Sequence, residues 1–282
     1  MKEFQGKVAV VTGGASGIGR AMAERFAEEG MRIVLADIET DTLEKTAAEL
    51  RAEGAEILSV VCDVSKKEDV ERLSQEAVKA YDTVHILCNN AGVGVVGFTW
   101  EIDLDDWEWV LGVNLWGVVY GTHYFTPIMI KNGDPCHIIN TASMAGLVNG
   151  TSMSPYYTSK HAVVSISESM HKELETLNSN VKISVLCPGW VNTRIHEADR
   201  NRPAGPQEID ESDTITLQFR EMFEQSLKEG LDPAHVAQMV LDAVVAEQFY
   251  ILPHAHLKNG IETRMQDVLQ VRNPTITVPQ ID

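Results

Sequence analysis

The chain has 282 residues, of which 44% are hydrophobic, and its formal net charge is −18. This length and composition favour one globular α/β domain that extends over residues 1–282. The negative charge argues against nucleic acid and membrane surfaces as partners, because both are anionic, and a solvated acidic surface explains it most simply.

The chain also lacks the patterns of an exported or membrane protein. It shows no apolar signal segment and no stretch long enough to span a bilayer, so we expect a cytoplasmic protein. Four cysteines lie far apart, without the spacing of metal ligands: Cys62, Cys88, Cys136 and Cys187. We expect these to be buried structural thiols, and we expect neither a disulfide framework nor a metal site.

Short apolar runs alternate with segments of helical period along the chain. The expected strands cover residues 7–12, 32–36, 57–62, 84–88, 137–142, 181–186 and 249–252. The expected helices cover residues 17–29, 41–53, 66–81, 106–130, 155–177 and 233–247. Ser65 and Glu68 have the spacing of a capping box for the third helix, and Asp232 with Pro233 opens the last.

This alternation predicts the fold class. Continuous apolar strands separated by amphipathic helices are typical of a parallel sheet that is covered on both faces. We expect a Rossmann-like, doubly wound sheet of about seven strands, with its ligand crevice at the carboxyl ends of the strands.

Two segments depart from the alternation. Residues 194–231 are polar and contain Pro203 and Pro206, and such a long insertion is expected to form a lid over the substrate. Residues 257–271, within a C-terminal tail of 256–282, form an amphipathic stretch. That stretch would close the lid or pack on a partner subunit.

The turn after the first strand reads Thr-Gly-Gly-Ala-Ser-Gly-Ile-Gly over residues 12–19. Glycines in a strand–turn–helix context let the backbone approach a pyrophosphate, which then faces the positive end of the helix dipole. A plain glycine-rich turn is the alternative, and the context disfavours it. The expected cofactor contacts in this turn are Gly13, Ser16, Gly17, Ile18 and Gly19.

Asp37 ends the second strand, 18 residues after Gly19. A carboxylate at this position can accept hydrogen bonds from the adenosine ribose and would repel a 2′-phosphate, and no arginine or lysine follows directly. We therefore expect NAD(H) and not NADP(H) as the cofactor. The alternative is that Asp37 merely caps the next helix.

Two further loops follow strands at the same edge of the sheet. Asp63 and Val64 fall where an adenine would lie, and the segment Asn90, Ala91 and Gly92 can pass under the cofactor. The amides of this loop can also tie neighbouring strands together. Taken alone, each segment is equally compatible with ordinary turn chemistry.

Tyr156 and Lys160 lie one helical turn apart, so they share one face of a helix that Ser154 would cap. The oxidation of an alcohol needs a base for the hydroxyl proton, an acceptor for the hydride and donors around the oxygen. A nearby ammonium and an oxidised nicotinamide would both lower the pKa of the tyrosine. A surface pair on a helix is the alternative for this spacing alone.

Two more polar residues can reach the same place. Ser143 ends the fifth strand, 13 residues before Tyr156. Asn114 interrupts a long helical pattern and could hold a water that links Lys160 to solvent, although a polar surface position is the alternative. The histidines near the site are not expected to take part: His161 should point off the Tyr156 face, and His254 and His256 are interpreted as loop residues.

These motifs, in this order from Thr12 to Thr193, resemble the short-chain dehydrogenase/reductase family. The resemblance implies that Tyr156 is the general acid/base, that Lys160 lowers its pKa and holds the nicotinamide ribose, and that Ser143 steadies the substrate oxygen. Asn114 would anchor a proton-relay water. Other implied cofactor contacts are Pro188, Gly189, Val191 and Thr193. The resemblance also implies a homodimer or a homotetramer.

The substrate is expected over the nicotinamide, near residues 93–96, 144–148, Met153, Trp190 and the lid. The lid adds Phe219, Met222 and Phe223, although such apolar stripes also form cores or interfaces. We expect a medium-sized apolar or aromatic secondary alcohol, or its ketone. Residues 192–204 and 249–254 resemble bacterial enzymes that include Cα-dehydrogenases of lignin-derived aryl ethers.

Two other functions remain open at this stage. A redox sensor could hold the dinucleotide without chemistry, but such a protein would be expected to lose Tyr156 or Lys160. An epimerase or dehydratase of the same fold could act through a transient ketone.

Overall fold

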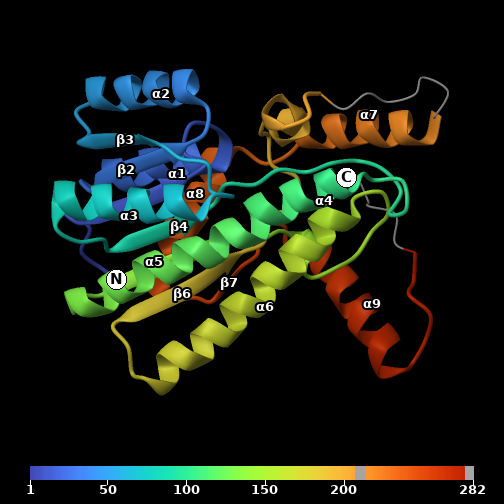
Figure 1. The fold of residues 1–282 in the computed structure, drawn as a ribbon. Helices are drawn as coiled ribbons and strands as arrows, with labels where there is room; N and C mark the ends of the chain where they lie inside the picture. The colour runs from blue at the N-terminus through green and yellow to red at the C-terminus, as the bar shows by residue number, and fades with distance from the viewer. Residues whose placement is uncertain (207–213, 277–282) are drawn as a thin grey trace.

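The computed structural model describes residues 1–206 and 214–276, so residues 207–213 of the expected lid and 277–282 of the tail lie outside the described residues. Strands and helices alternate along the chain (Figure 1). The strands are β1 Val8–Thr12, β2 Arg32–Asp37, β3 Ile57–Val61, β4 Ile86–Asn89, β5 Cys136–Thr141, β6 Val181–Leu186 and β7 Tyr250–Ile251. The helices are α1 Gly17–Glu28, α2 Thr40–Ala52, α3 Lys67–Tyr81, α4 Leu104–Leu111, α5 Gly117–Asn132, α6 Ser154–Thr176, α7 Thr214–Lys228, α8 Pro233–Ala246 and α9 Lys258–Leu269.

Within the described residues, seven parallel strands form one sheet in the order β3-β2-β1-β4-β5-β6-β7. The chain winds outward from β1 to β3, returns to β4 beside β1, and winds outward in the other direction to β7. The expected doubly wound fold is therefore confirmed. The loops after β1 and β4 leave toward opposite sides, which opens a crevice at the carboxyl ends of these strands.

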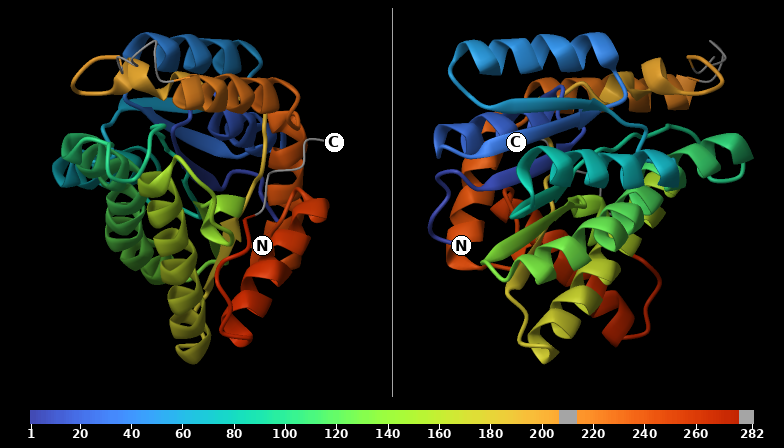
Figure 2. Two further views of the ribbon diagram at one scale, coloured as in Figure 1. Left: turned by 90° about the vertical axis from the view of Figure 1, so that its right-hand side faces the viewer. Right: turned by 60° about the vertical axis from the view of Figure 1, so that its left-hand side comes forward.

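Alternate residues of each central strand face two separate cores. In β1, Ala9 and Val11 pack with α1, α2 and α8, whereas Val8 and Val10 pack with α3, α5 and α6. Figure 2 shows these helices on the two faces of the sheet. Because both faces are covered, the strands are apolar throughout and not alternating. All four cysteines are buried free thiols, as expected.

The segment 106–130, expected to be one helix, consists of α4 and α5 with an irregular turn between them. A π-helical turn, Gly112–Trp116, joins α4 to α5. The extra residue of a π turn shifts the helical register. Asn114 lies at this turn and is fully buried, so the surface alternative for that residue is excluded.

Two capping predictions are wrong and one is confirmed. Helix α3 begins at Lys67 with Lys66 as its N-cap, because Ser65 instead bonds the carboxylate of Asp63 through its backbone and its hydroxyl. A short polar side chain often prefers such a local partner. Ser154 is the first residue of α6 and not its cap. The Asp232 side chain does cap α8, accepting from the Ala234 amide at 2.8 Å.

The expected lid contains a helix, α7, which the sequence analysis did not predict. Phe219, Phe223 and Leu227 recur at every fourth residue, and this spacing could have indicated it. The two ends of the insertion meet in a narrow neck, where the Leu231 amide donates to the Trp190 carbonyl and the Asn192 amide donates to the Leu231 carbonyl.

The amphipathic stretch near the C-terminus is helical, as α9. Leu257 and Ile261 pack against the core below β6, whereas Val268 and Leu269 are exposed, so only the first half of the apolar face is covered. Among the described helices, none is both long and apolar enough to cross a membrane.

Gly121 on α5 packs directly against β4, and a Cβ there would collide with the buried amide oxygen of Asn89. The amide nitrogen of Asn89 donates to Asn140 on β5 at 2.9 Å, so the side chain cannot swing away without losing this bond. We therefore expect Gly121→Ala to lower the free energy of unfolding by about 1–3 kcal/mol, despite the higher helix propensity of alanine. Urea unfolding measures this, with His123→Ala at an exposed position of the same helix as the control. Equal stability of the two variants would contradict this packing.

Candidate functional site

A cavity of about 1100 Å³ opens at the carboxyl ends of the strands, since residues that follow β1, β2, β3, β4, β5 and β6 line it. Most predicted cofactor residues lie on its wall: Gly13, Ser16, Gly17, Ile18, Asp37, Asp63, Val64, Asn90, Ala91, Gly92, Tyr156, Lys160, Pro188, Gly189, Val191 and Thr193. Ser143 also lines it. Gly19 and Asn114 do not line the cavity but contact residues that do.

The glycine-rich turn is built for a close approach. Gly13 has φ +63°, and a Cβ there would lie 2.8 Å from the Cα of Ala91. A Cβ at Gly19 would collide with the carbonyl oxygen of Gly13, so α1 can start next to the turn only without a side chain at that position. The N-terminus of α1 therefore points into the cavity with small residues around it, which fits the pyrophosphate of a dinucleotide.

Asp37 is held at the edge of the cavity by its own loop. Its carboxylate accepts from the Ala15 amide at 3.0 Å and from the Glu39 amide at 3.1 Å. Burial raises the pKa of Asp37, and these two hydrogen bonds oppose the rise. The residue before α2 is Glu39, so Asp37 is not the cap of that helix. A fixed carboxylate at this place can receive ribose hydroxyls.

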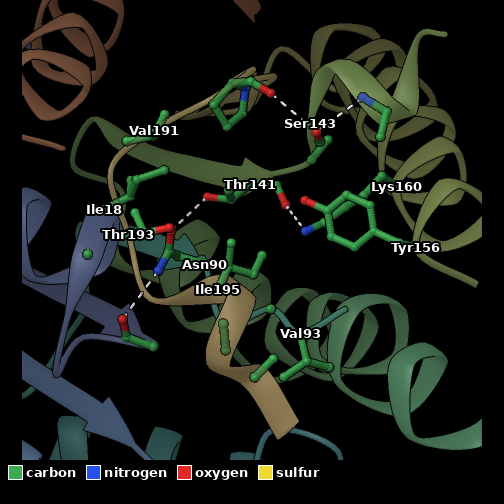
Figure 3. Close-up of a pocket in the computed structure, with 18 of the residues that line it drawn as sticks. Ile18, Asn90, Val93, Thr141, Ser143, Tyr156, Lys160, Val191, Thr193 and Ile195 are labelled. Atoms are coloured by element: carbon green, nitrogen blue, oxygen red, sulfur yellow. Dashed lines mark hydrogen bonds between the residues drawn. The ribbon is translucent and has the colours of Figure 1, made fainter. Parts of the chain in front are cut away.

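Asn90 ties together the ends of three strands (Figure 3). Its side-chain amide donates to the Thr12 carbonyl of β1 at 3.1 Å, and its amide oxygen accepts from the Thr141 hydroxyl of β5 at 3.2 Å. Its backbone amide donates to the Thr12 hydroxyl at 2.9 Å. The floor of the crevice is therefore rigid at the point where β1, β4 and β5 end.

Tyr156, Lys160 and Ser143 meet at one end of the cavity (Figure 3). The Lys160 ammonium lies 5.5 Å from the centroid of the Tyr156 ring and donates to the Thr141 carbonyl at 2.9 Å. The Ser143 hydroxyl accepts from the Ala145 amide and donates to the Pro188 carbonyl at 3.2 Å. Lys160 is only 2% exposed, so the surface-pair alternative is excluded.

The electrostatics of this group differ from our expectation. Burial lowers the pKa of Lys160 to about 8. Burial also raises the pKa of Tyr156 to about 12, although a hydrogen bond with Ser143 acts in the opposite direction. The expected fall of the tyrosine pKa is therefore not found in this structure, because the loss of water around the phenol outweighs the hydrogen bond with Ser143.

Asn114 holds the loop that carries Gly92. Its amide oxygen accepts from the Val93 amide at 2.8 Å, and its amide nitrogen donates to the Val93 carbonyl at 2.9 Å and to the Ser159 hydroxyl at 3.1 Å. A Cβ at Gly92 would lie 3.4 Å from Lys160 Nζ and 3.5 Å from Asn114 Oδ1, so these two atoms face the same point. The π-helical turn is what brings Asn114 there.

Other residues at the site were not found by sequence reasoning. His254 lies in a loop, as expected, but it is buried, accepts from the Gly189 amide at 3.0 Å and bonds the Trp190 carbonyl at 2.9 Å. It fixes the loop after β6. His256 lies in the 3₁₀ helix Ala255–Leu257, so its interpretation as a loop residue is wrong, and it lines the cavity, as do Asn259 and Arg200. No local pattern marked these residues, since they reach the site from distant parts of the chain.

The wall beyond Tyr156 is mostly apolar. It is lined by Val93, Met144, Val148, Met153, Trp190, Phe223 and Leu227. Trp190 and Phe223 contact edge to face at 5.5 Å, so the lid packs directly on the loop after β6. Phe219 packs behind this wall with Val96.

Comparison with known proteins agrees with this geometry. The family model for short chain dehydrogenases matches residues 7–204. A 1-deoxy-11-beta-hydroxypentalenate dehydrogenase of Streptomyces arenae is 41% identical over 94% of this chain and 88% of its own. A C alpha-dehydrogenase of Sphingobium sp. strain SYK-6 is 31% identical over 99% of this chain and 91% of its own.

A solved structure shares nearly the whole fold. It is a short chain dehydrogenase/reductase from Burkholderia phymatum in complex with NAD, 42% identical, with a TM-score of 0.95 over 99% of this chain and all of the other. The motifs, the sheet order and these relatives agree, and the chain therefore belongs to the short-chain dehydrogenase/reductase family of oxidoreductases.

Proposed function

We propose that the protein is an NAD(H)-dependent dehydrogenase that interconverts a medium-sized apolar or aromatic secondary alcohol and its ketone. The observation that carries the proposal is the meeting of Tyr156, Lys160 and Ser143 in the same cavity as the glycine-rich turn and Asp37. A group for proton transfer and a cradle for a dinucleotide thus share one space. Residues 194–231 would serve as the lid over the alcohol.

The chain's own residues would handle the proton and the oxygen. The Tyr156 hydroxyl exchanges a proton with the oxygen of the substrate, and the Ser143 hydroxyl turns from the Pro188 carbonyl to donate to that oxygen. The Lys160 ammonium, whose Nζ is held by the Thr141 carbonyl, favours the phenolate when the proton leaves. A bound nicotinamide supplies the acceptor of the hydride in oxidation and its donor in reduction. Asn114 is proposed to anchor the water that returns the proton to solvent.

The preference for NAD(H) is supported by the carboxylate of Asp37. Asp37 and Glu39 both line the cavity, and because Glu39 is paired with Arg200, a 2′-phosphate there would meet chiefly the negative charge of Asp37. The Burkholderia phymatum relative is in complex with NAD. The apolar wall supports an apolar substrate, and both curated relatives described above are named as dehydrogenases.

Tyr156→Phe removes the proton-transfer group and little else. Because general acid/base catalysis contributes roughly 10²–10⁴-fold, we expect at least a hundredfold loss in NADH formation from aryl secondary alcohols. Binding of NADH, followed by fluorescence, should change less than about threefold, since the ring itself remains. Tyr124→Phe is the control, because the Tyr124 hydroxyl bonds Glu71 of α3 and the residue does not line the cavity. Full turnover by the Tyr156 variant would refute the mechanism, and turnover of small polar alcohols only would refute the substrate class.

Asp37→Ser removes the charged acceptor at the ribose end. A hydrogen bond to a charged group contributes about 1.5–3 kcal/mol, so we expect the ratio of NADH to NADPH affinity to fall by roughly 10–100-fold. Asp41→Ser is a matched control at an exposed position in the first turn of α2. The preference for NADH over NADPH would have another origin if both variants kept the wild-type ratio.

Lys160→Met should make the protein inactive but more stable at neutral pH. The folded protein binds the Lys160 proton with a pKa of about 8 against an ordinary 10.5, so the unfolded chain binds more protons between these values. The free energy of unfolding of the wild type should therefore rise with pH across that window. The variant should lack this rise and gain about 1–3 kcal/mol at pH 7.

Chemical unfolding at a series of pH values measures the effect. Lys131→Met, at an exposed position near the end of α5, is expected to leave both the stability and its pH dependence nearly unchanged. A Lys160 variant that is less stable than the wild type at pH 7 would show that the ammonium is well compensated in its pocket.

A further inference from the structure

We propose that Glu39 is a positioning residue that makes the lid part of the dinucleotide site, so that the cofactor and the lid are released together. The inference rests on the proposed function, because it assumes that the cavity binds NAD(H). It concerns the segment 194–203, here called the strap, which contains a 3₁₀ helix, Ile195–Asn201, and crosses from Thr193 toward α4.

The strap is attached to the loop between β2 and α2 through Glu39. One oxygen of this carboxylate accepts from Arg200 Nε at 2.8 Å and from Asn201 Nδ2 at 2.9 Å, and Arg200 Nη2 lies 2.7 Å from it. Its other oxygen accepts from the Thr42 hydroxyl at 3.2 Å. These donors hold the pKa of Glu39 below its ordinary value against the opposing effect of burial. The side chains of Glu39 and Arg200 are 18% and 28% exposed, so the pair lies at the surface, in reach of solvent ions.

Arg200 also ties the strap to itself. Its Nη1 donates to the carbonyls of Arg194 and Glu197, at 3.0 Å and 2.8 Å. The guanidinium therefore binds the carboxylate with one edge and the 3₁₀ helix with another, and a planar fork can do both without strain. Loss of the Glu39 contact would leave the helix formed but free to leave the loop.

A second ion pair anchors the far end of the strap. Arg202 and Asp106 of α4 form a two-pronged pair, with Nε to Oδ1 at 2.6 Å and Nη2 to Oδ2 at 3.1 Å. Their side chains are 10% and 4% exposed, so this anchor is buried and strong. The strap is thus held on both sides of the cavity, and the Glu39 side is the more exposed and weaker of the two.

The attachment matters because it lies on the cavity wall. Asp37, Glu39, Arg200 and Asn201 all line the cavity. A ligand that reaches Asp37 therefore lies beside the pair that closes the strap, and we expect the intact pair to hinder its departure on that side. By linkage, the closed strap slows the release of the dinucleotide, and opening it requires the separation of Glu39 from Arg200.

The test is the rate of NADH release, measured by stopped-flow fluorescence with an excess of NAD. We expect Glu39→Gln and Arg200→Met each to speed release by about 5–30-fold, and the double variant to release no faster than the quicker single variant. High salt should speed release from the wild type more than from the variants, since it screens the pair. Glu224→Gln is the control, because Glu224 pairs with Lys228 within α7, outside the strap, and neither residue lines the cavity.

A second readout needs no cofactor. Hydrogen–deuterium exchange of peptides from 194–206 should be faster in both single variants than in the wild type and the control. NADH release at the wild-type rate from Glu39→Gln would overturn the inference, and so would independent, multiplying effects of the two substitutions, which would mean that each residue contacts NADH by itself. A wild-type protein that does not bind NADH at all would instead refute the proposed function.

Discussion

The site depends on one constraint of the sheet, the reversal of winding between β1 and β4. Parallel strands that are wound in opposite directions leave their loops on opposite sides, and the crevice between them needs a floor that spans the gap. Asn90 provides this floor by bonding both Thr12 and Thr141. The glycine-rich turn, the loop with Gly92 and the group around Tyr156 are all placed relative to that floor. The hydrogen bonds of the Asn90 amide thus fix the positions of the loops on both sides of the crevice.

The burial of Lys160 lowers the stability of the folded protein but serves the proposed chemistry of the site. The Lys160 ammonium is buried beside an aromatic ring, with the Thr141 carbonyl as its hydrogen-bond acceptor, and among the described residues no carboxylate forms an ion pair with it. Such a position raises the free energy of the folded state, because the desolvation of a charge is only partly compensated by one neutral acceptor. The same lack of a carboxylate leaves the charge free to act on the phenol. A lysine that was fully paired with a carboxylate would destabilise the folded state less, but its charge would have a weaker effect on the Tyr156 phenol.

Much of the fold and the site could be predicted from the sequence, for a physical reason. Gly13 and Ser143 follow strands, Asp37 ends one, and Tyr156 lies in the first turn of a helix, so a doubly wound sheet brings them to one edge once the strands are identified. Features set by tertiary contacts could not be predicted. Glu39 and Arg200 are 161 residues apart, and His254 reaches Gly189 only because β7 lies beside β6. The pKa of Tyr156 follows its burial, and the cap at Ser65 was lost to Asp63, a competing acceptor two residues away.

The neck between Trp190 and Leu231 has a consequence for how such enzymes diversify. The two ends of the insertion are hydrogen-bonded to each other, so the chain leaves the β6–α8 connection and returns to it at nearly the same point. The intervening residues can then change in length and composition without altering the strands below. The insertion is therefore closed on itself at the neck and held to the scaffold by a few side-chain contacts, so a new specificity can be acquired by exchange of one closed loop.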